Sequence, residues 1–534
     1  MTHRPAALAA SLMLTALSPA LLPAQVANAG DREPAAAPSH SERALPGSAL
    51  QRILQRLEEQ NDRLAEQNAK LAEQNARLSE QNQRLELKLE NIARQRASTE
   101  APVLAPAEPQ PGNERKTAPV ASVPAGPPRL TRPTPEVGPS EHPAGQVVIA
   151  RNKREDDMPF ELRADLFSQV RYSYFAERAD EWTDSAGNVL PLRGFDSLEL
   201  TRNFIQLSGY AIDRRLQFTA NLFSSTALNS TNYLGWINYQ FNRAIDIRAG
   251  NWIVPGTREW LESFRYTLGA DRLMATTFFR PNISPGIWAQ GEPLENLHYV
   301  LMFANSLNRF NQGVERIGNS WALGGTLWWE PFGSFGPGPS DIEHHARLSP
   351  RVGTNFAFGL ESNQGVNSDQ TGNPEDTILR LSDGTPLFRP GSLAPGVELR
   401  SVNVNLWTID LAMKYRGFAL SGEYFLRWLG GFEPIGGVVP LDSLFDHGAL
   451  LQTAYFVLPG TVEGFARSSF VSGHFGGGYE VGGGVNWYIR GNRDWRMTVE
   501  VLNINRSPAQ NLLTGYRAGE SGTLYQLQLF TDFF

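Results

Sequence analysis

Hydrophobic and polar residues alternate with a period of two in several segments after Phe160, which is the pattern of a strand with one apolar face. In Leu216–Leu222, every second residue is apolar and the residues between them are polar. The pattern recurs in segments 409–416, 418–428, 481–490 and 495–501. Gly, Asn, Asp and Pro separate these segments and are typical of turns. Residues 160–534 are therefore predicted to form consecutive antiparallel strands.

A soluble antiparallel sandwich shows the same period, so alternation alone leaves two architectures open. An export signal, aromatic residues near strand ends and a final aromatic strand favour a transmembrane barrel. No change of composition divides residues 160–534 into sandwich domains. We predict an all-β transmembrane antiparallel barrel there. Its last strand has an apolar face of Tyr525, Leu527, Leu529 and Phe533, with Phe534 out of phase unless a bulge shifts the register.

Residues 1–29 have the features of a secretory signal peptide. An apolar run from Ala6 to Leu17 is followed by Ala27-Asn28-Ala29, a small-x-small cleavage site. The alternative is a short amphipathic helix that stays in the mature protein, but the run is too short to span a bilayer. We expect the mature protein to begin at Gly30 and residues 30–47 to be disordered.

Residues 48–96 contain an apolar residue, nearly always leucine, at every seventh position, which predicts an α-helical coiled coil. Asparagines four residues after successive leucines would occupy buried a positions, where they weaken a coiled coil but specify its register and oligomer number. A solvated single helix is the alternative. The coiled coil implies self-association outside the barrel. The heptad residues are Leu57, Leu64, Leu71, Leu78, Leu85 and Ile92, and the asparagines are Asn61, Asn68, Asn75 and Asn82.

Residues 97–159 are predicted to be a Pro-rich linker, because Pro, Ala and Glu are frequent and apolar periodicity is absent.

The composition of the whole chain argues against some classes of protein. No eighteen consecutive apolar residues follow the first thirty, so a helical membrane protein is not expected. The net charge of −7 does not provide the basic surface that nucleic acid requires. The absence of cysteine is compatible with an exported protein that does not rely on disulfides.

Five segments resemble the phosphate-selective porin family usually named porin O and P. The resemblance implies an outer-membrane barrel of about sixteen strands, a homotrimer, an inward-folded third loop and a lumen lined by arginines. The alternation by itself neither requires about sixteen strands nor excludes about fourteen or eighteen. The segments are LELTRNFIQLSGYAIDRRLQFTANLF (198–223), WINYQFNRAIDIRAGNWIVP (236–255), FRPNISPGIWAQGE (279–292), LLQTAYFVLPGTVEGFARSSF (450–470) and NWYIRGNRDWRMTVEVLNIN (486–505).

The chain departs from that family in its cations. The resemblance implies a cluster of lysines near the constriction, whereas Lys414 is the only lysine from Phe160 onward. Lysine offers phosphate a compact charge and arginine a planar fork, so the two residues do not make equivalent sites. The departure weakens the case for phosphate selectivity and leaves the prediction of a pore.

The segment Ile245–Glu292 begins as an alternating strand and then, after about Asn251, loses alternation. We predict that it folds into the lumen and constricts the pore. Arginine rings would favour anions, whereas facing rows of Arg and Glu would suit small polar solutes. Pairing of these charges on a surface loop is the alternative. The constriction candidates are Arg258, Arg265, Arg272, Arg280, Glu259, Glu262 and Asp271.

Cations on the predicted lumen faces either form a basic track or are balanced by Glu161, Asp165, Glu423 and Glu500 as ordinary lumen polarity. These lumen candidates are Arg163, Arg171, Arg248, Lys414, Arg416, Arg427 and Arg496.

Signals of enzymatic chemistry are weak. Glu343, His344 and His345 are adjacent in a Gly/Pro-rich segment, but the spacing does not match a metal site. The barrel region lacks a Gly-x-Ser-x-Gly elbow, and the chain lacks a Walker loop. We expect no catalytic residues, metal or cofactor.

The favoured function is an outer-membrane porin, a trimeric water-filled channel for passive, anion-biased diffusion of small anionic or polar solutes. Its partners would be outer-membrane lipid and its own copies, with the coiled coil in the periplasm. One alternative is an envelope anchor that ties the barrel to the cell wall through the coiled coil. The other is an outer-membrane barrel hydrolase with Ser, His and Asp on separate strands.

Overall fold

The computed structural model describes residues 146–152, 158–227, 230–307, 321–362 and 379–533. All of them belong to the unit Pro127–Phe534. The predicted signal peptide and coiled coil, most of the predicted linker, and Phe534 lie outside the described residues and stay predictions.

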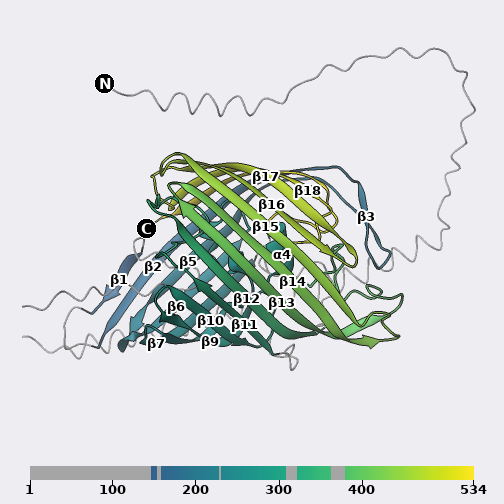
Figure 1. Ribbon diagram of the computed structural model, residues 1–534, viewed down its shortest axis with the longest axis horizontal. Coiled ribbons are helices and arrows are strands. Elements are labelled where there is room, and N and C mark those ends of the chain that lie inside the picture. The colour runs from purple at the N-terminus through teal and green to yellow at the C-terminus, as the bar shows by residue number, and fades with distance from the viewer. Residues whose placement is uncertain (1–145, 153–157, 228–229, 308–320, 363–378, 534) are drawn as a thin grey trace, which may run out of the picture. The chain divides into compact units, whose positions relative to one another are not determined.

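A 17-stranded sheet consists of the short strand β1 (Val147–Arg151) and a closed ring of the 16 other strands (Figure 1). In chain order the ring strands are β2 (Phe160–Glu177), β5 (Phe195–Ala211), β6 (Asp213–Ser225), β7 (Ser230–Asn242), β8 (Ile245–Ile253), β9 (Ile283–Leu294), β10 (Leu297–Ala304), β11 (Ala322–Trp329), β12 (Ser349–Ser362), β13 (Glu398–Tyr415), β14 (Phe418–Ile435), β15 (Ser443–Leu458), β16 (Val462–Gly473), β17 (Gly476–Tyr488), β18 (Trp495–Asn505) and β19 (Gly522–Asp532).

Each ring strand pairs antiparallel with the next along the chain, and β19 closes the ring by pairing with β2. Closure leaves no unpaired edge in the ring, which is how a sheet satisfies its backbone in a bilayer. The predicted antiparallel barrel is confirmed. Its 16 strands agree with the number that the family resemblance implied.

Strand β1 pairs with β2 from Val147↔Ala164 to Arg151↔Glu161, on the edge of β2 that β19 leaves uncovered. It belongs to the range that was predicted to be linker. Ordered structure therefore begins before Phe160, because the strand edge of β2 extends beyond the end of β19 and offers backbone groups for pairing.

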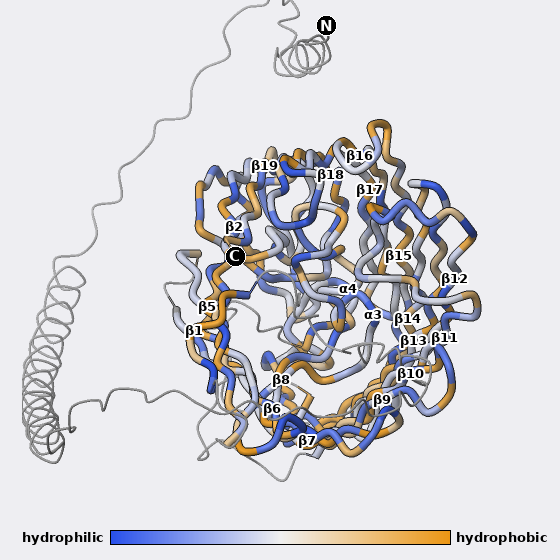
Figure 2. Tube along the Cα trace, turned by 90° about the vertical axis from the view of Figure 1, so that its left-hand side faces the viewer, coloured by the Kyte–Doolittle hydropathy of each residue, from blue (hydrophilic) through white to orange (hydrophobic). Residues whose placement is uncertain are grey.

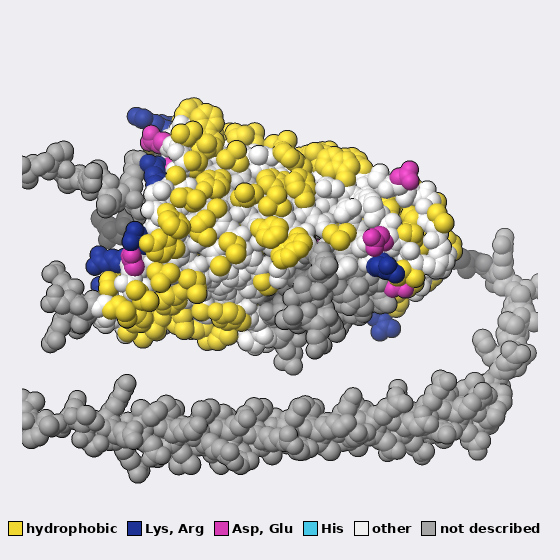
Figure 3. All heavy atoms as spheres, turned by 90° about the horizontal axis from the view of Figure 1, so that it is seen from below, with side chains coloured by type: hydrophobic (Ala, Val, Ile, Leu, Met, Phe, Trp, Pro, Cys, Tyr) yellow, Lys and Arg dark blue, Asp and Glu magenta, His cyan; other side chains and the backbone are white. Residues whose placement is uncertain are grey.

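Side chains on the ring strands alternate between an apolar outer face and a polar inner face. On β14, the outward Tyr424 and Trp428 are 41% and 42% exposed, whereas the inward Glu423 and Arg427 are 4% and 1% exposed. Figure 3 shows hydrophobic side chains across the middle of the wall and charged side chains gathered toward its ends. This arrangement is inverted relative to a soluble protein and is expected for a membrane barrel.

Within the described residues, the helical elements are α3 (Arg258–Leu261), the 3-10 helix η1 (Phe264–Tyr266) and α4 (Met274–Phe279). Among the described residues, no helix combines the length and apolar character needed to cross a membrane. All three lie in the connection between β8 and β9, inside the ring (Figure 2). A further hairpin, β3 (Glu181–Thr183) with β4 (Val189–Pro191), lies in the connection between β2 and β5.

The ring has two different ends. The end that holds β1 and the last residue of β19 is called the terminus end. Its connections between ring strands include the two-residue turns 243–244, 295–296 and 416–417, and all of them have six residues or fewer except residues 330–348. The opposite end carries long connections, including 178–194 and 506–521.

The apolar outer face leads to a prediction about how the barrel lies in a lipid bilayer. Replacing Val499, an outward residue near the middle of β18, with Arg should lower the free energy of unfolding by about 2–4 kcal/mol, because a charge then faces hydrocarbon. The same change at Leu458, the last residue of β15, should cost about 0–1 kcal/mol. Urea unfolding in lipid vesicles measures both, and equal losses at the two positions would contradict a membrane-spanning orientation.

Candidate functional site

Residues 254–282, here named the inner loop, connect β8 to β9 through the inside of the ring. The predicted strand that was expected to end near Asn251 runs to Ile253. Two hydroxyl side chains start the helical turns: Thr257 accepts from Trp260 N at 3.3 Å and Ser263 accepts from Arg265 N at 3.3 Å. These caps satisfy N–H groups that a short helix leaves without partners.

Glutamates on the barrel wall bind the backbone of the inner loop. Helix α4 has no side-chain cap of its own, and Glu480 of β17 accepts from Met274 N at 2.6 Å instead. A carboxylate at a helix start also interacts favourably with the positive end of the helix dipole. Two further bonds of this kind run from Arg258 N to Glu423 (2.8 Å) and from Ala270 N to Glu500 (2.9 Å).

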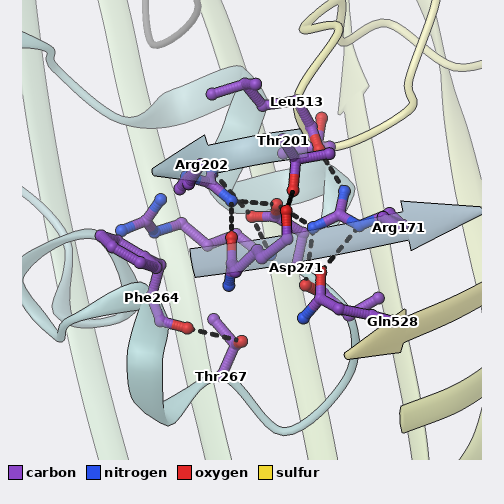
Figure 4. A network of polar contacts seen from close by, with 12 residues as sticks. Arg171, Thr201, Arg202, Phe264, Thr267, Asp271, Leu513 and Gln528 are labelled. Atoms are coloured by element: carbon purple, nitrogen blue, oxygen red, sulfur yellow. Dashed lines mark hydrogen bonds and ion pairs between the residues drawn. The ribbon is translucent and has the colours of Figure 1, made fainter. Parts of the chain in front are cut away.

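Asp271 of the inner loop lies between two arginines of the barrel wall (Figure 4). Arg171 of β2 donates to its Oδ2 at 2.7 Å, and Arg202 of β5 donates to the same oxygen at 2.5 Å. Arg171 also donates to Ala270 O at 2.8 Å. Two wall arginines therefore hold one loop carboxylate, and all three side chains are almost completely buried.

Burial alone would raise the pKa of Asp271, but the neighbouring guanidinium groups of Arg202 and Arg171 outweigh it and hold the pKa well below its usual range. Asp271 is therefore ionised at neutral pH. The carboxyl group of Glu259 has the opposite balance: burial raises its pKa, although Thr276 Oγ1 and Leu273 N donate to it.

Arg265 fastens the inner loop to the seam where the first and last strands of the ring meet. It donates to Asp165 of β2 at 2.8 Å and to Asp532 of β19 at 2.9 Å. Its guanidinium carbon lies 3.6 Å from the centre of the Phe167 ring, which adds a cation–π contact.

The other two predicted arginines of the inner loop stack on one indole. Arg272 and Arg280 lie 4.5 Å and 3.7 Å from the ring of Trp260. The stack orders both guanidinium groups, because a planar cation on an aromatic face loses much of its freedom. Trp260 itself is buried among aromatic and aliphatic residues of the loop and wall.

Glu262 differs from the other six constriction candidates because its side chain is 18% exposed, whereas each of those six residues is 7% exposed or less. It pairs with Arg258 at 2.9 Å and faces Arg351 of β12, which is 12% exposed, at 3.5 Å. Glu262 and Arg351 thus form a charged pair beside the inner loop that keeps partial access to solvent. A facing acid and base set up a transverse field.

Arg351 was missed in the sequence analysis. Pro350 and a Gly/Pro-rich stretch precede it, which hid the start of β12. The alternation of Val352, Thr354 and Phe356 with small or polar residues was a signal that placed Arg351 on the inward face.

Six of the seven lumen candidates lie on strand faces that carry other buried charged residues, and Arg416 does not. Arg416 is exposed in the turn between β13 and β14, with a φ of +48°, and lies over the ring of Tyr415. The strand ends one residue before the alternation predicted. The other six are Arg163, Arg171, Arg248, Lys414, Arg427 and Arg496.

Many of these cations are bound to acids or carbonyl groups. Arg427 pairs with Asp446 at 2.7 Å, and Arg163 pairs with Glu161 at 2.5 Å. Arg496 donates to Thr267 O of the inner loop at 2.7 Å. The described lumen is accordingly of mixed charge. The two ion pairs lie within the wall, whereas Arg496 attaches the inner loop to the wall.

Among the described residues, Asp341, Glu343 and His345 form a group whose potential ligand atoms lie within 4.8 Å of one another. Their atoms already have partners: Asp341 Oδ1 lies 2.5 Å from His345 Nδ1, and Glu343 forms an ion pair with Arg493. We therefore assign no metal to this group.

Neither a scan against protein-family models nor a search of curated proteins gives a match. Among solved structures, an anion-selective porin from Comamonas acidovorans has a TM-score of 0.44 and 14% identity, over 70% of this chain and 100% of that one. The outer-membrane channel DcaP of Acinetobacter baumannii has a TM-score of 0.41 and 8% identity, over 72% and 100%. OmpF of Salmonella typhi has 0.38 and 11%, over 70% and 98%. Values this low support no inference about function, which has to come from this chain's own residues.

The pairing of Asp271 with Arg171 and Arg202, here named the Asp271 clamp, leads to a prediction about stability as a function of pH. Asp271→Asn should lower the free energy of unfolding at neutral pH by about 3–5 kcal/mol, because two buried guanidinium groups lose their counter-charge. A carboxyl with a lowered folded-state pKa stabilises the fold above its unfolded value, 3.8, and loses that contribution as the pH falls. The difference between the two proteins should therefore shrink in acid.

Urea unfolding in lipid vesicles at neutral and acid pH measures this effect. Asp213→Asn is the matched control, because Asp213 forms an exposed pair with Arg215 at 2.7 Å. Exposed pairs contribute little. A pH-independent effect of Asp271→Asn would show that its charge is not what holds the loop.

Proposed function

We propose that this chain is an outer-membrane porin that lets small polar solutes diffuse passively through the barrel. The observation that carries the proposal is the combination of a closed 16-stranded ring, an apolar outer face and charged inward faces. An apolar belt suits a bilayer, and a polar interior suits water and hydrophilic solutes. In this proposal, outer-membrane lipid surrounds the barrel wall.

The inner loop is the proposed constriction. Its partly exposed Glu262 faces Arg351, so a passing solute meets both signs of charge at one level. We propose a mixed-charge filter with a modest anion bias that comes from the inward arginines. Their acidic partners limit that bias, and Lys414 alone does not provide the lysine cluster expected of a phosphate site.

Recordings in planar bilayers test the channel and its filter. Purified protein should produce ion-conducting steps, and the reversal potential in a salt gradient reports the sign of selectivity. Glu262→Gln should shift selectivity toward anions and Arg351→Gln toward cations, because each removes one charge of the facing pair. Glu433→Gln, an exposed residue of β14, is the control that should change neither. Absence of channels from correctly folded protein would overturn the proposal.

A homotrimer is part of the proposal, supported by the coiled-coil pattern of residues 48–96 and by exposed aromatic and aliphatic residues on the wall. The unheated protein should migrate on a gel as a trimer, and mass photometry in detergent gives the number of copies directly. A monomer in both measurements would remove this part of the proposal and leave the channel.

An additional anchoring role is favoured by the position of β1. It attaches the N-terminal extension to β2 at the terminus end, next to the ring's seam. We propose that a periplasmic coiled coil beyond it contacts the cell wall. Deleting residues 48–96 should reduce the amount of barrel that co-sediments with purified wall, while channel conductance stays unchanged. Equal co-sedimentation would refute the anchor.

A further inference from the structure

Residues 330–348, here named the inner turn, connect β11 to β12 at the terminus end, where the other connections between ring strands have one to six residues. Phe335, Ser340 and Asp341 of this turn are buried. Gly336 and Gly338 have φ values of +76° and +63°, which a residue with a side chain rarely adopts. The glycines let the turn bend back into the barrel.

The inner turn meets the inner loop, which enters from the opposite end. A Cβ added to Gly338 would lie 2.6 Å from Tyr266 Cβ, so the two backbones are in close contact. Pro339 of the turn and Thr267 of the loop also border one cavity of about 10 Å³, which has space for about one water.

The inner turn encloses Lys414, the single lysine after Phe160. Its Nζ donates to Phe335 O at 3.1 Å and to Pro337 O at 3.2 Å. The same nitrogen lies 4.3 Å from the centre of the Phe335 ring, and the residue is 0% exposed. Two carbonyl groups and an aromatic face therefore take the place of solvent around this ammonium group.

The inner turn also binds a second cation, Arg493, whose side chain is 12% exposed. Arg493, in the turn between β17 and β18, forms an ion pair with Glu343 of the inner turn. It also donates to Pro337 O at 3.3 Å and Ser340 O at 3.4 Å. One short segment thus occupies the donors of both Lys414 and Arg493.

The wall holds the inner turn in this position. Ser340 Oγ donates to Glu463 of β16 at 2.6 Å, and Asp341 Oδ2 accepts from Gly417 N at 2.7 Å. These bonds are independent of the two cations. The turn is thus bound to several strands of the ring and is not a free surface segment.

We propose that the inner turn is a specificity-determining segment that hides Lys414 from the solute path and balances the charge of Arg493 through Glu343. In place, it keeps the terminus end of the lumen near charge balance. Displaced, it exposes Lys414 to passing solutes and separates Arg493 from Glu343, and both changes increase the preference for anions. The inference rests on the proposed channel function.

Gly338→Val tests the proposal by displacing the turn, because the added side chain collides with Tyr266. Gly396→Val is the matched control: Gly396 has a similar φ of +74°, and nothing lies within 4 Å of its added Cβ. The first readout is acetylation of the native Lys414 by a water-soluble amine reagent, followed by mass spectrometry, with urea-unfolded protein as the reference for full reaction.

Lys414 should react slowly in the wild type and in Gly396→Val, and about tenfold or more faster in Gly338→Val, because reaction reports how often the turn opens. In bilayers, Gly338→Val should shift the reversal potential toward anions. Adding Lys414→Gln and Arg493→Gln should cancel that shift, which a merely structural role of the turn would not produce.

Fast acetylation of Lys414 in the wild type would overturn the proposal, as would a Gly338→Val channel with unchanged acetylation and reversal potential. Heat-modified gel migration confirms that each variant is folded. Acetylation does not need conduction, so the two proposals fail separately. Folded protein that shows the acetylation difference without channels would refute the porin and not the enclosure of Lys414.

Discussion

A segment enclosed in a β-barrel must have its polar groups satisfied by the barrel wall, because bulk water no longer surrounds it. The inner loop meets this constraint with carboxylates and guanidinium groups from the inward faces. Glu480 caps α4, and Arg171 and Arg202 hold Asp271. The wall in turn depends on the loop, because these inward charges would otherwise lack partners in a crowded interior.

In the proposed channel, this mutual satisfaction decides which charged groups remain accessible to solutes. Arg265 is taken up by Asp165 and Asp532, and the Asp271 clamp is buried. The facing pair of Glu262 and Arg351 keeps partial exposure. The arginine-rich composition of the loop is therefore a poor guide to selectivity, since Arg265 binds the wall and Arg272 and Arg280 stack on Trp260 of the loop itself.

The lumen is narrowed from both ends. The inner loop enters from the end with long connections, and the inner turn enters from the terminus end, where carbonyl groups of Phe335 and Pro337 surround Lys414. A cation enclosed by carbonyls contributes less to the field in the lumen than one that faces water. Lysine content alone therefore does not report how basic the solute path is.

The sequence by itself determined the barrel and the orientation of most side chains. A period of two places Glu423 and Arg427 on one face of β14 and Tyr424 and Trp428 on the other, whatever the rest of the chain does. It also marked Ile245–Glu292 as an interrupted strand. Alternation did not predict side-chain orientation at turns, because the period of two holds only for extended backbone. Arg416 lies in such a turn and not on the strand.

Only the tertiary structure decided which charged residues pair with one another. Asp271 and Arg171 are 100 residues apart, and closure of the ring brings them together. No local pattern encodes such a pairing, because it depends on strand register and on the path of the inner loop across the barrel. The exposure of Glu262, the role of Arg351 and the enclosure of Lys414 follow from the same cause. Each depends on what another segment places beside it.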